Sequence, residues 1–175
     1  MDSIFVRSRM NEEDFKNYLY YHQYYAEKNY IPVRTAISFG IGLAAAFFSS
    51  DRLVTFLVIS ILCLLVFLVF PWCRIRFSYK KIYVRNRSQA FSQSQDFEFS
   101  PEYMGFKSEH ENEYVYEPYS NLKKAAETKT LYIITFSKKQ TAVAVKRFAD
   151  SEKQKEISRL LEKNLGDRYT KITRI

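Results

Sequence analysis

The sequence predicts an α+β membrane protein, in which a helical hairpin crosses the bilayer and a cytosolic antiparallel β-domain follows it. Three observations predict this fold class. The apolar residues gather between positions 36 and 72, although the mean hydropathy of the 175-residue chain is only −0.31. From residue 96 the pattern changes to short runs with a period of two, which is typical of strands. After residue 150 the apolar residues follow the period of an amphipathic helix.

Residues 1–30 are predicted to form a cytosolic N-terminal segment, with a short alternating strand followed by a Tyr-rich amphipathic helix. Asn11 and the three acidic residues after it are typical of a helix start. Aromatic side chains then recur at helical spacing, and Tyr20, Tyr21 and Tyr24 widen the aromatic face. One interpretation makes this face a binding surface for a partner. The other makes the helix lie at the membrane interface or pack on the cytosolic domain, with its hydroxyls in water.

Residues 31–72 are predicted to form a transmembrane helical hairpin with spans at 31–50 and 53–72. The second span holds about twenty residues without a charge, enough to cross a hydrocarbon core of roughly 30 Å. The polar residues at 49–52 are the predicted tip. A single helix through both runs would bury the two charges of this tip in the bilayer at a cost of several kcal/mol, whereas a hairpin leaves them in water.

Residues 73–95 are predicted to form a basic juxtamembrane helix or linker. Lys and Arg residues flank the hairpin on its outer ends, while the tip offers only Arg52, so the positive-inside rule places both termini in the cytoplasm. The segment's cations are candidate ligands for an anionic lipid surface, although topology alone also demands them. They are Arg74, Arg76, Lys80, Lys81, Arg85 and Arg87. The net charge of +8 also suits nucleic acid, but no reader helix or RNA-stacking motif accompanies it, so we expect no nucleic-acid partner.

Residues 96–166 are predicted to form a cytosolic β-domain of five or six antiparallel strands and a C-terminal helix, followed by a tail at 167–175. Asp150 or Ser151 is the expected N-cap of that helix and Gly166 its stop signal. Its apolar face consists of Ile157, Leu160, Leu161 and Leu165. Strands followed by one amphipathic helix are the element order of pleckstrin-homology-like folds.

The stretch 119–165 combines several short motifs with the predicted final helix. The motif residues are Tyr119, Ser120, Leu122, Glu127, Thr128, Lys146, Arg147 and Phe148, with a hydrophobic strand at 131–136. This pattern resembles the C-terminal domain of the YcxB-like family of bacterial membrane proteins, which also has two spans before the domain. The resemblance implies a multi-pass protein of the bacterial cytoplasmic membrane. None of its motifs is catalytic.

The sequence contains no persuasive enzyme constellation. Only four glycines occur, so no phosphate-cradling loop is present, and two Cys and two separated His cannot make a four-ligand metal site. We therefore expect no catalytic residues, cofactor or metal. The favoured function is a non-enzymatic, membrane-tethered interaction or regulatory module whose partner is a protein or an anionic lipid. The alternative is an immunity or self-resistance protein against a toxin or a membrane-active peptide.

Overall fold

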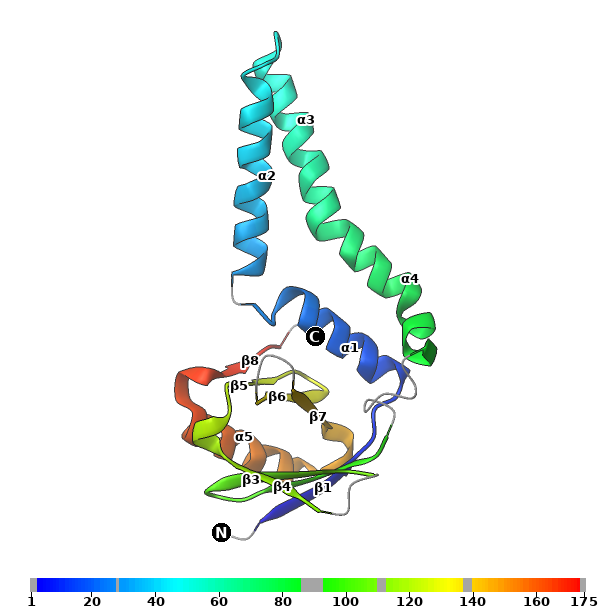
Figure 1. Cartoon of the computed structure of the whole chain (residues 1–175), viewed down its shortest axis with the longest axis vertical. Coiled ribbons are helices and arrows are strands. Elements are labelled where there is room, and N and C mark those ends of the chain that lie inside the picture. Colours follow the sequence, from blue (N-terminus) through cyan, green and yellow to red (C-terminus); the bar gives the residue numbers. More distant parts are fainter. Residues whose placement is uncertain (1–2, 28, 86–92, 110–112, 137–139, 174–175) are drawn as a thin grey trace. The chain divides into compact units, whose positions relative to one another are not determined.

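The computed structural model describes residues 3–27, 29–85, 93–109, 113–136 and 140–173 (Figure 1). These residues form two compact units, which we describe separately. The first comprises Met1–Tyr18 with Ile82–Ile175, and the second comprises Leu19–Lys81. The predicted α+β class is confirmed, because antiparallel strands and several helices, one of them long and apolar, make up the chain.

The first unit contains a four-stranded antiparallel sheet in the order β1-β2-β3-β4. Its strands are β1 (Ile4–Ser8), β2 (Gln95–Phe99), β3 (Tyr103–Ser108) and β4 (Val115–Pro118). The period-two pattern explains the two faces, since Phe97 and Phe99 point into the core and Glu98 between them points to the outer face. The predicted N-terminal strand is therefore part of this sheet, although the chain between β1 and β2 carries the whole helical hairpin.

The second sheet of this unit has the order β7-β6-β5-β8. It contains β5 (Lys124–Glu127), β6 (Leu131–Thr135), β7 (Thr141–Val145) and β8 (Tyr169–Lys171). The last strand runs parallel to β5, whereas the other pairs are antiparallel. The two sheets meet where the backbone N–H of Val145 donates to the Ser8 hydroxyl, over 2.8 Å.

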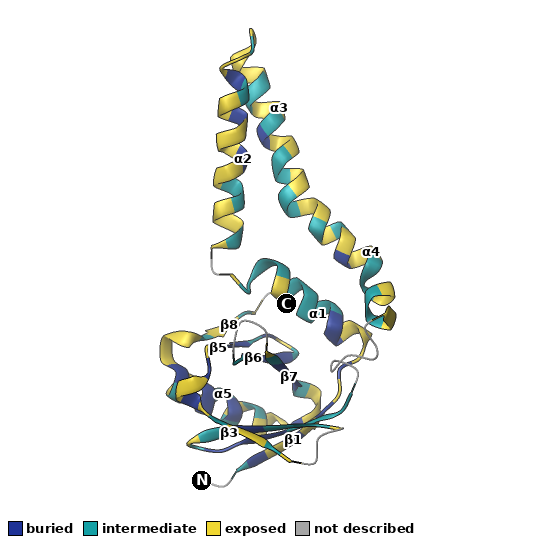
Figure 2. Ribbon diagram, in the orientation of Figure 1, coloured by how far each residue is buried: buried dark blue, intermediate teal, exposed yellow. Residues whose placement is uncertain are grey.

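Helix α5 (Ser151–Leu165) follows β7 and a short 3₁₀ turn, η4 (Lys146–Phe148). The Asp150 side chain caps its first turn by accepting from the N–H of Lys153, and Gly166 with φ +53° ends it. Both end signals of the sequence are thus confirmed. The predicted apolar face is buried in the core with the inner residues of both sheets (Figure 2).

Helix α1 (Glu12–Tyr24) begins with a reciprocal cap. The N–H of Asp14 donates to the Asn11 side chain, and the N–H of Asn11 donates to the Asp14 carboxylate, each over 2.9 Å. This confirms the helix start expected at Asn11. The first part of α1 belongs to the first unit and its last turns belong to the second.

The second unit contains the hairpin. Helix α2 (Tyr30–Ala46) leads to a turn at residues 47–51, from which α3 (Arg52–Leu64), the π-helical turn η1 (Leu65–Val69) and α4 (Phe70–Arg85) run as one uninterrupted helix. Within the described residues, this 34-residue helix is the one long and apolar enough to cross a membrane, and α2 with 17 residues is shorter.

One predicted boundary of the hairpin is corrected. The first helix does not continue to residue 50 but ends at Ala46, and the turn starts earlier than the predicted tip at 49–52. The second helix runs past the predicted span end at Trp72 into the basic segment as far as Arg85, in agreement with a helical juxtamembrane segment. A proline lacks only its own N–H and disturbs the carbonyl four residues before it, which here is Phe67. The π-helical turn around Phe67 absorbs that disturbance, so the helix continues through Pro71.

Candidate functional site

The two helices of the hairpin pack through small side chains. Ser38, Gly42 and Ala46 are buried on α2 at intervals of four residues, and Gly42 lies against the buried Ser60 of α3. A Cβ atom added to Gly42 would lie 2.1 Å from the Ser60 Oγ and 2.9 Å from the Phe56 carbonyl oxygen. This spacing is the small-xxx-small pattern by which membrane helices approach closely.

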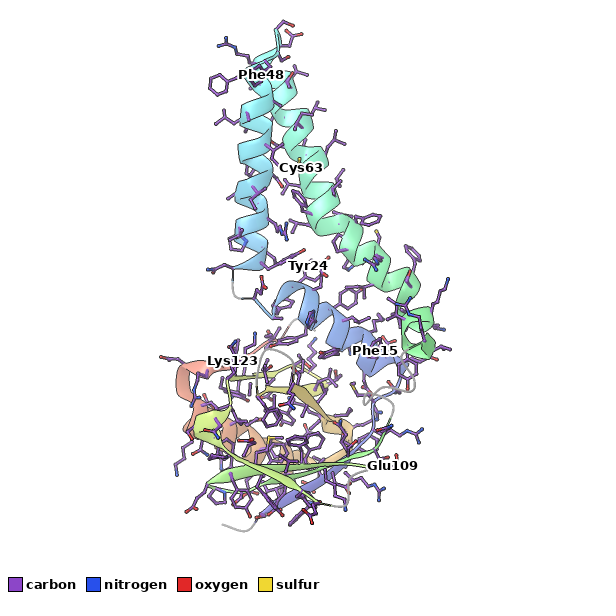
Figure 3. The ribbon with its side chains drawn as sticks, viewed as in Figure 1. Phe15, Tyr24, Phe48, Cys63, Glu109 and Lys123 are labelled. Atoms are coloured by element: carbon purple, nitrogen blue, oxygen red, sulfur yellow. The ribbon has the colours of Figure 1, made fainter. Side chains whose placement is uncertain are left out.

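The other sides of both helices expose large apolar residues. Phe39 and Leu43 on α2 are about half exposed, as are Leu57 and Ile61 on α3. Phe48 at the turn is 95% exposed (Figure 3). Exposed apolar surface of this extent is unfavourable in water and marks a surface that another apolar phase or partner covers.

Helix α4 carries the predicted basic residues on the continuation of the apolar helix. Those within the described residues are exposed, namely Arg74, Arg76, Lys80, Lys81 and Arg85. Arg87, the sixth candidate, lies outside the described residues. The Arg76 guanidinium lies 5.9 Å from the centre of the Trp72 ring, so an aromatic side chain and a cation are adjacent where the apolar stretch ends.

The three candidate tyrosines of α1 differ in their surroundings. Tyr21 is buried, while Tyr20 and Tyr24 are partly exposed. The Tyr24 hydroxyl donates to the Leu68 carbonyl over 2.7 Å, and the Tyr30 hydroxyl donates to the Phe67 carbonyl over 3.4 Å. Tyr24 therefore supports the π-helical turn of its own unit. A partner-binding role for these tyrosines stays a prediction.

Two of the motif residues in the β-domain form an ion pair. The Lys146 ammonium donates to one carboxylate oxygen of Glu127 over 2.5 Å, and the Tyr169 hydroxyl donates to the other oxygen. Both charged side chains are more than four-fifths buried. Burial alone would raise the pKa of Glu127, but the hydrogen bonds from Lys146 and Tyr169 and the charge of Lys146 outweigh burial and hold this pKa below its ordinary value.

The remaining motif residues serve the local structure of the domain. Tyr119 and Leu122 are buried, and the Tyr119 hydroxyl donates to the Ser100 carbonyl over 2.9 Å. The Thr128 hydroxyl accepts from the N–H of Leu131, which closes the turn between β5 and β6. Arg147, Phe148 and Ser120 are exposed. Arg147 reaches back to the buried Asp14 of α1 over 2.6 Å.

Glu127 also lines an open depression of about 560 Å³ beside helix α5. Polar and charged side chains of α5 and Lys171 of β8 form the rest of its wall. Both Glu127 oxygens already accept hydrogen bonds, so this carboxylate joins β5, η4 and β8 rather than offering a free base. Within the described residues, no three His, Cys, Asp or Glu side chains gather closely enough to hold a metal ion.

Two features of the structure, the π-helical turn and the contact made by Tyr169, have no signal in the sequence pattern. The residues of η1 continue the apolar pattern of α3, so nothing in their spacing marks a π-helical turn except Pro71 just after it. Tyr169, which completes the Glu127 cluster, lies in the segment predicted as a tail at 167–175.

No family model, no curated protein and no solved structure matches this chain.

Proposed function

We propose that this protein is a non-enzymatic integral membrane protein, in which a two-helix hairpin anchors a cytosolic β-domain that acts as an interaction or regulatory module. The hairpin consists of α2 and the continuous helix from α3 to α4. Anionic lipid at the cytosolic surface is the first partner we propose, bound by the exposed cations of α4.

The observation that carries this proposal is the pairing of β1 with β2. Ile4 to Ser8 pair with Phe99 to Gln95, and the whole hairpin lies in the chain between them. Two paired strands lie on the same side of a membrane, so the chain between them crosses it an even number of times. If the long helix spans the bilayer, α2 must cross as well.

The dimensions of α2 are compatible with that crossing. Its 17 residues extend for about 26 Å, close to the roughly 30 Å of a hydrocarbon core. The apolar residues at the turn, Phe47 and Phe48, lengthen the apolar hairpin further. The small-residue contact at Gly42 and Ser60 and the apolar outer sides of both helices also support two adjacent spans.

The charge distribution supports the orientation. The tip of the hairpin carries one anion and one cation, Asp51 and Arg52, whereas the opposite ends of the helices carry the cations of α4 and Arg34. Each cation close to an anionic leaflet contributes about 1 kcal/mol of attraction, so a cluster of five gives α4 a preference for such lipid. The strands followed by α5 also follow the order of pleckstrin-homology-like domains, and the resemblance to the YcxB-like family supports a bacterial cytoplasmic membrane.

Trp72 offers a direct test of the lipid preference, because it is the chain's single tryptophan. The protein is reconstituted in nanodiscs of mixed phosphatidylglycerol and phosphatidylcholine, with bromine, which quenches tryptophan fluorescence, on the acyl chains of one lipid at a time. We expect stronger quenching by the brominated anionic lipid at equal mole fraction. The difference should disappear when charges on α4 are reversed in the variant Lys80→Glu/Lys81→Glu/Arg85→Glu.

A matched control reverses three exposed lysines on α5 instead, in the variant Lys153→Glu/Lys155→Glu/Lys163→Glu. The control should keep the wild-type preference. Equal quenching by both lipids in the wild-type protein would contradict lipid recognition by α4. Absence of quenching by either lipid would contradict membrane insertion itself.

The two-span topology has an independent test in cysteine labelling of intact cells. In a chain with Cys63 and Cys73 replaced by alanine, Phe48→Cys should react with a membrane-impermeant maleimide from outside. Glu102→Cys in the β-domain should react only after the membrane is permeabilised. Labelling of position 102 in sealed cells would reverse the orientation.

A further inference from the structure

The outer face of the first sheet carries a corner built from two tyrosines. Tyr103 of β3 and Tyr116 of β4 stand almost perpendicular, with an angle of 86° between their rings and 5.2 Å between their centres. Glu102 and Pro118 complete the wall of an open pocket of about 440 Å³ at this corner. Tyr116 is 54% exposed, so one face of its ring is accessible from outside.

Gly105 makes this arrangement possible. It pairs with Tyr116 on one side and Glu98 on the other. A Cβ atom at this position would lie 2.8 Å from Cε1 of Tyr116 and 3.3 Å from a ring atom of Tyr114. Without that Cβ, the Tyr116 ring lies directly against the sheet. The Tyr114 ring stacks beside it at 5.7 Å and 19°.

A buried carboxylate lies next to this aromatic cluster. Glu98 is only 6% exposed, and its Oε1 accepts a hydrogen bond from the Tyr103 hydroxyl over 3.1 Å. In the described part of the chain no Lys or Arg forms an ion pair with Glu98, whereas Asp96 two residues earlier pairs with Arg7 over 3.5 Å. The pKa of Tyr116 is raised, first by desolvation of the Tyr116 hydroxyl and then by the charge and hydrogen bonding of Glu98.

A buried carboxylate without a neighbouring cation is unfavourable, because burial removes water from its charge and no opposite charge offsets that cost. Aromatic faces attract cations through their quadrupole, and rings around a carboxylate combine both attractions. The same cluster already receives one ammonium group of the chain itself, since Nζ of Lys107 lies 5.9 Å from the centre of the Tyr114 ring. An anion would be repelled by Glu98 and by Glu102.

We propose that the corner formed by Tyr103 and Tyr116 is a binding site for an alkylammonium cation. The cation sits against the tyrosine rings, and its charge is balanced by the carboxylates of Glu98 and Glu102. Its source is either a free quaternary ammonium compound or the side chain of a lysine in a peptide segment. This site is separate from the lipid contacts of α4 and does not depend on them.

The test uses the full-length protein in detergent with tyrosine rings labelled by ¹³C. Three probes are titrated in parallel, and their binding is followed by the chemical shifts of the tyrosine rings. The probes are tetramethylammonium, an acetylated and amidated lysine, and neopentyl alcohol as a neutral probe of similar size to the first. We expect saturable shifts with at least one ammonium probe and none with the alcohol.

Two variants test the assigned residues. Glu98→Gln keeps the size of the side chain and removes its charge, while Tyr116→Ala removes one wall. Each should weaken ammonium binding about tenfold, as expected for the loss of a partly desolvated cation contact. Val115→Ala changes the neighbouring residue on the opposite face of β4 and should bind as the wild-type protein does.

The two ammonium probes distinguish the sources. Preference for tetramethylammonium favours a free quaternary compound, preference for the lysine probe favours a peptide, and either result supports the site. Three results would overturn the proposed site. They are binding of the neutral alcohol as strong as that of the ammonium probes, ammonium binding by folded Glu98→Gln as strong as in the wild-type protein, and no saturable binding of either ammonium probe.

Discussion

Replacing Lys146 by methionine is expected to destabilise the β-domain through the charge that remains on Glu127. The Lys146 and Glu127 side chains are 11% and 16% exposed, and their charged atoms lie 2.5 Å apart. Methionine keeps most of the apolar volume of lysine, so the main change is the loss of the ammonium group. The ammonium also lies 4.7 Å from the centre of the Tyr132 ring, a contact that the substitution removes as well.

The size of the effect follows from this burial. Removing one partner of a buried ion pair costs about 3–5 kcal/mol in general. The Tyr169 hydroxyl still donates to Glu127 after the substitution, and both groups keep some solvent contact, so we expect about 2–4 kcal/mol. Against a typical domain stability of about 5–15 kcal/mol, that loss is large.

The effect has a defined pH dependence. In the wild-type protein the pKa of Glu127 lies below its ordinary value of about 4.5, so its stabilising contribution is present above that value and is lost as the pH falls below it. In Lys146→Met the dominant remaining influence is burial, which raises this pKa. The folded variant then gains a proton more readily than the unfolded chain, and the difference in stability between the two proteins shrinks as the pH falls from 7 towards 5.

Hydrogen–deuterium exchange of the detergent-solubilised protein measures this effect locally. Peptides covering β5, β6 and β7 should exchange about 30- to 1,000-fold faster in Lys146→Met at pH 7. The control is Lys153→Met, because the Lys153 ammonium is half exposed and lies 3.9 Å from Asp150. Such a surface pair contributes about 0–1 kcal/mol. If both variants exchange alike, the ion pair does not support the domain and the reasoning is refuted.

Three further substitutions test other parts of the fold. Gly42→Ala should push α2 away from α3 and lower the melting temperature of the protein in detergent. Adding Ser60→Gly should partly restore the melting temperature, because the Ser60 hydroxyl is the nearest atom that the new Cβ would clash with. An unchanged melting temperature in Gly42→Ala would contradict the close contact. Asp150→Ala removes the cap of α5 and should cost about 1 kcal/mol in denaturant unfolding, and an unchanged midpoint would dispute the cap. Leu161→Ala, at a fully buried position, should cost about 2–5 kcal/mol in the same assay, and less than 1 kcal/mol would show a poorly packed core.

The local signals of the sequence predicted the elements that depend on neighbouring residues. The cap at Asn11, the cap at Asp150 and the stop at Gly166 all follow from interactions within a few residues. Such interactions have the same consequence in nearly any tertiary context, which is why they can be read from one sequence.

Other elements depend on partners far along the chain and were not predicted. The strand β5 has the sequence KAAE, with two alanines and no β-branched residue, and its strand conformation is fixed by pairing with β6 and β8. The three residues of β8 fall in the predicted tail for the same reason, because their strand pairing is with distant β5. The pocket at Tyr103 and Tyr116 results from the register between β3 and β4, which no local pattern specifies.

The candidate sites divide in the same way. The basic stretch of α4 is recognisable in the sequence because a continuous helix keeps its cations next to the apolar run, and their contact with lipid stays a prediction. The motif residues Glu127 and Lys146 were named without any sign that they pair, since 18 residues and two strands separate them. In the alternating pattern of β2, Glu98 falls at an ordinary outward-facing polar position. Only its burial in the folded sheet distinguishes it from an exposed glutamate.

The position of β1 at the start of the chain has a consequence for how the protein is made. Its partner β2 begins only at Gln95, so a growing chain contains a finished first strand long before its neighbour exists. At a typical synthesis rate of about 5–20 residues per second, β1 waits for roughly 4–17 s while the hairpin is produced. In the proposed membrane topology, the helices can therefore enter the bilayer before the sheet closes. Under the same proposal, closure of the sheet then holds both ends of the hairpin on one side of the membrane, so a wrongly inserted hairpin would leave the domain unable to fold and exposed to proteolysis.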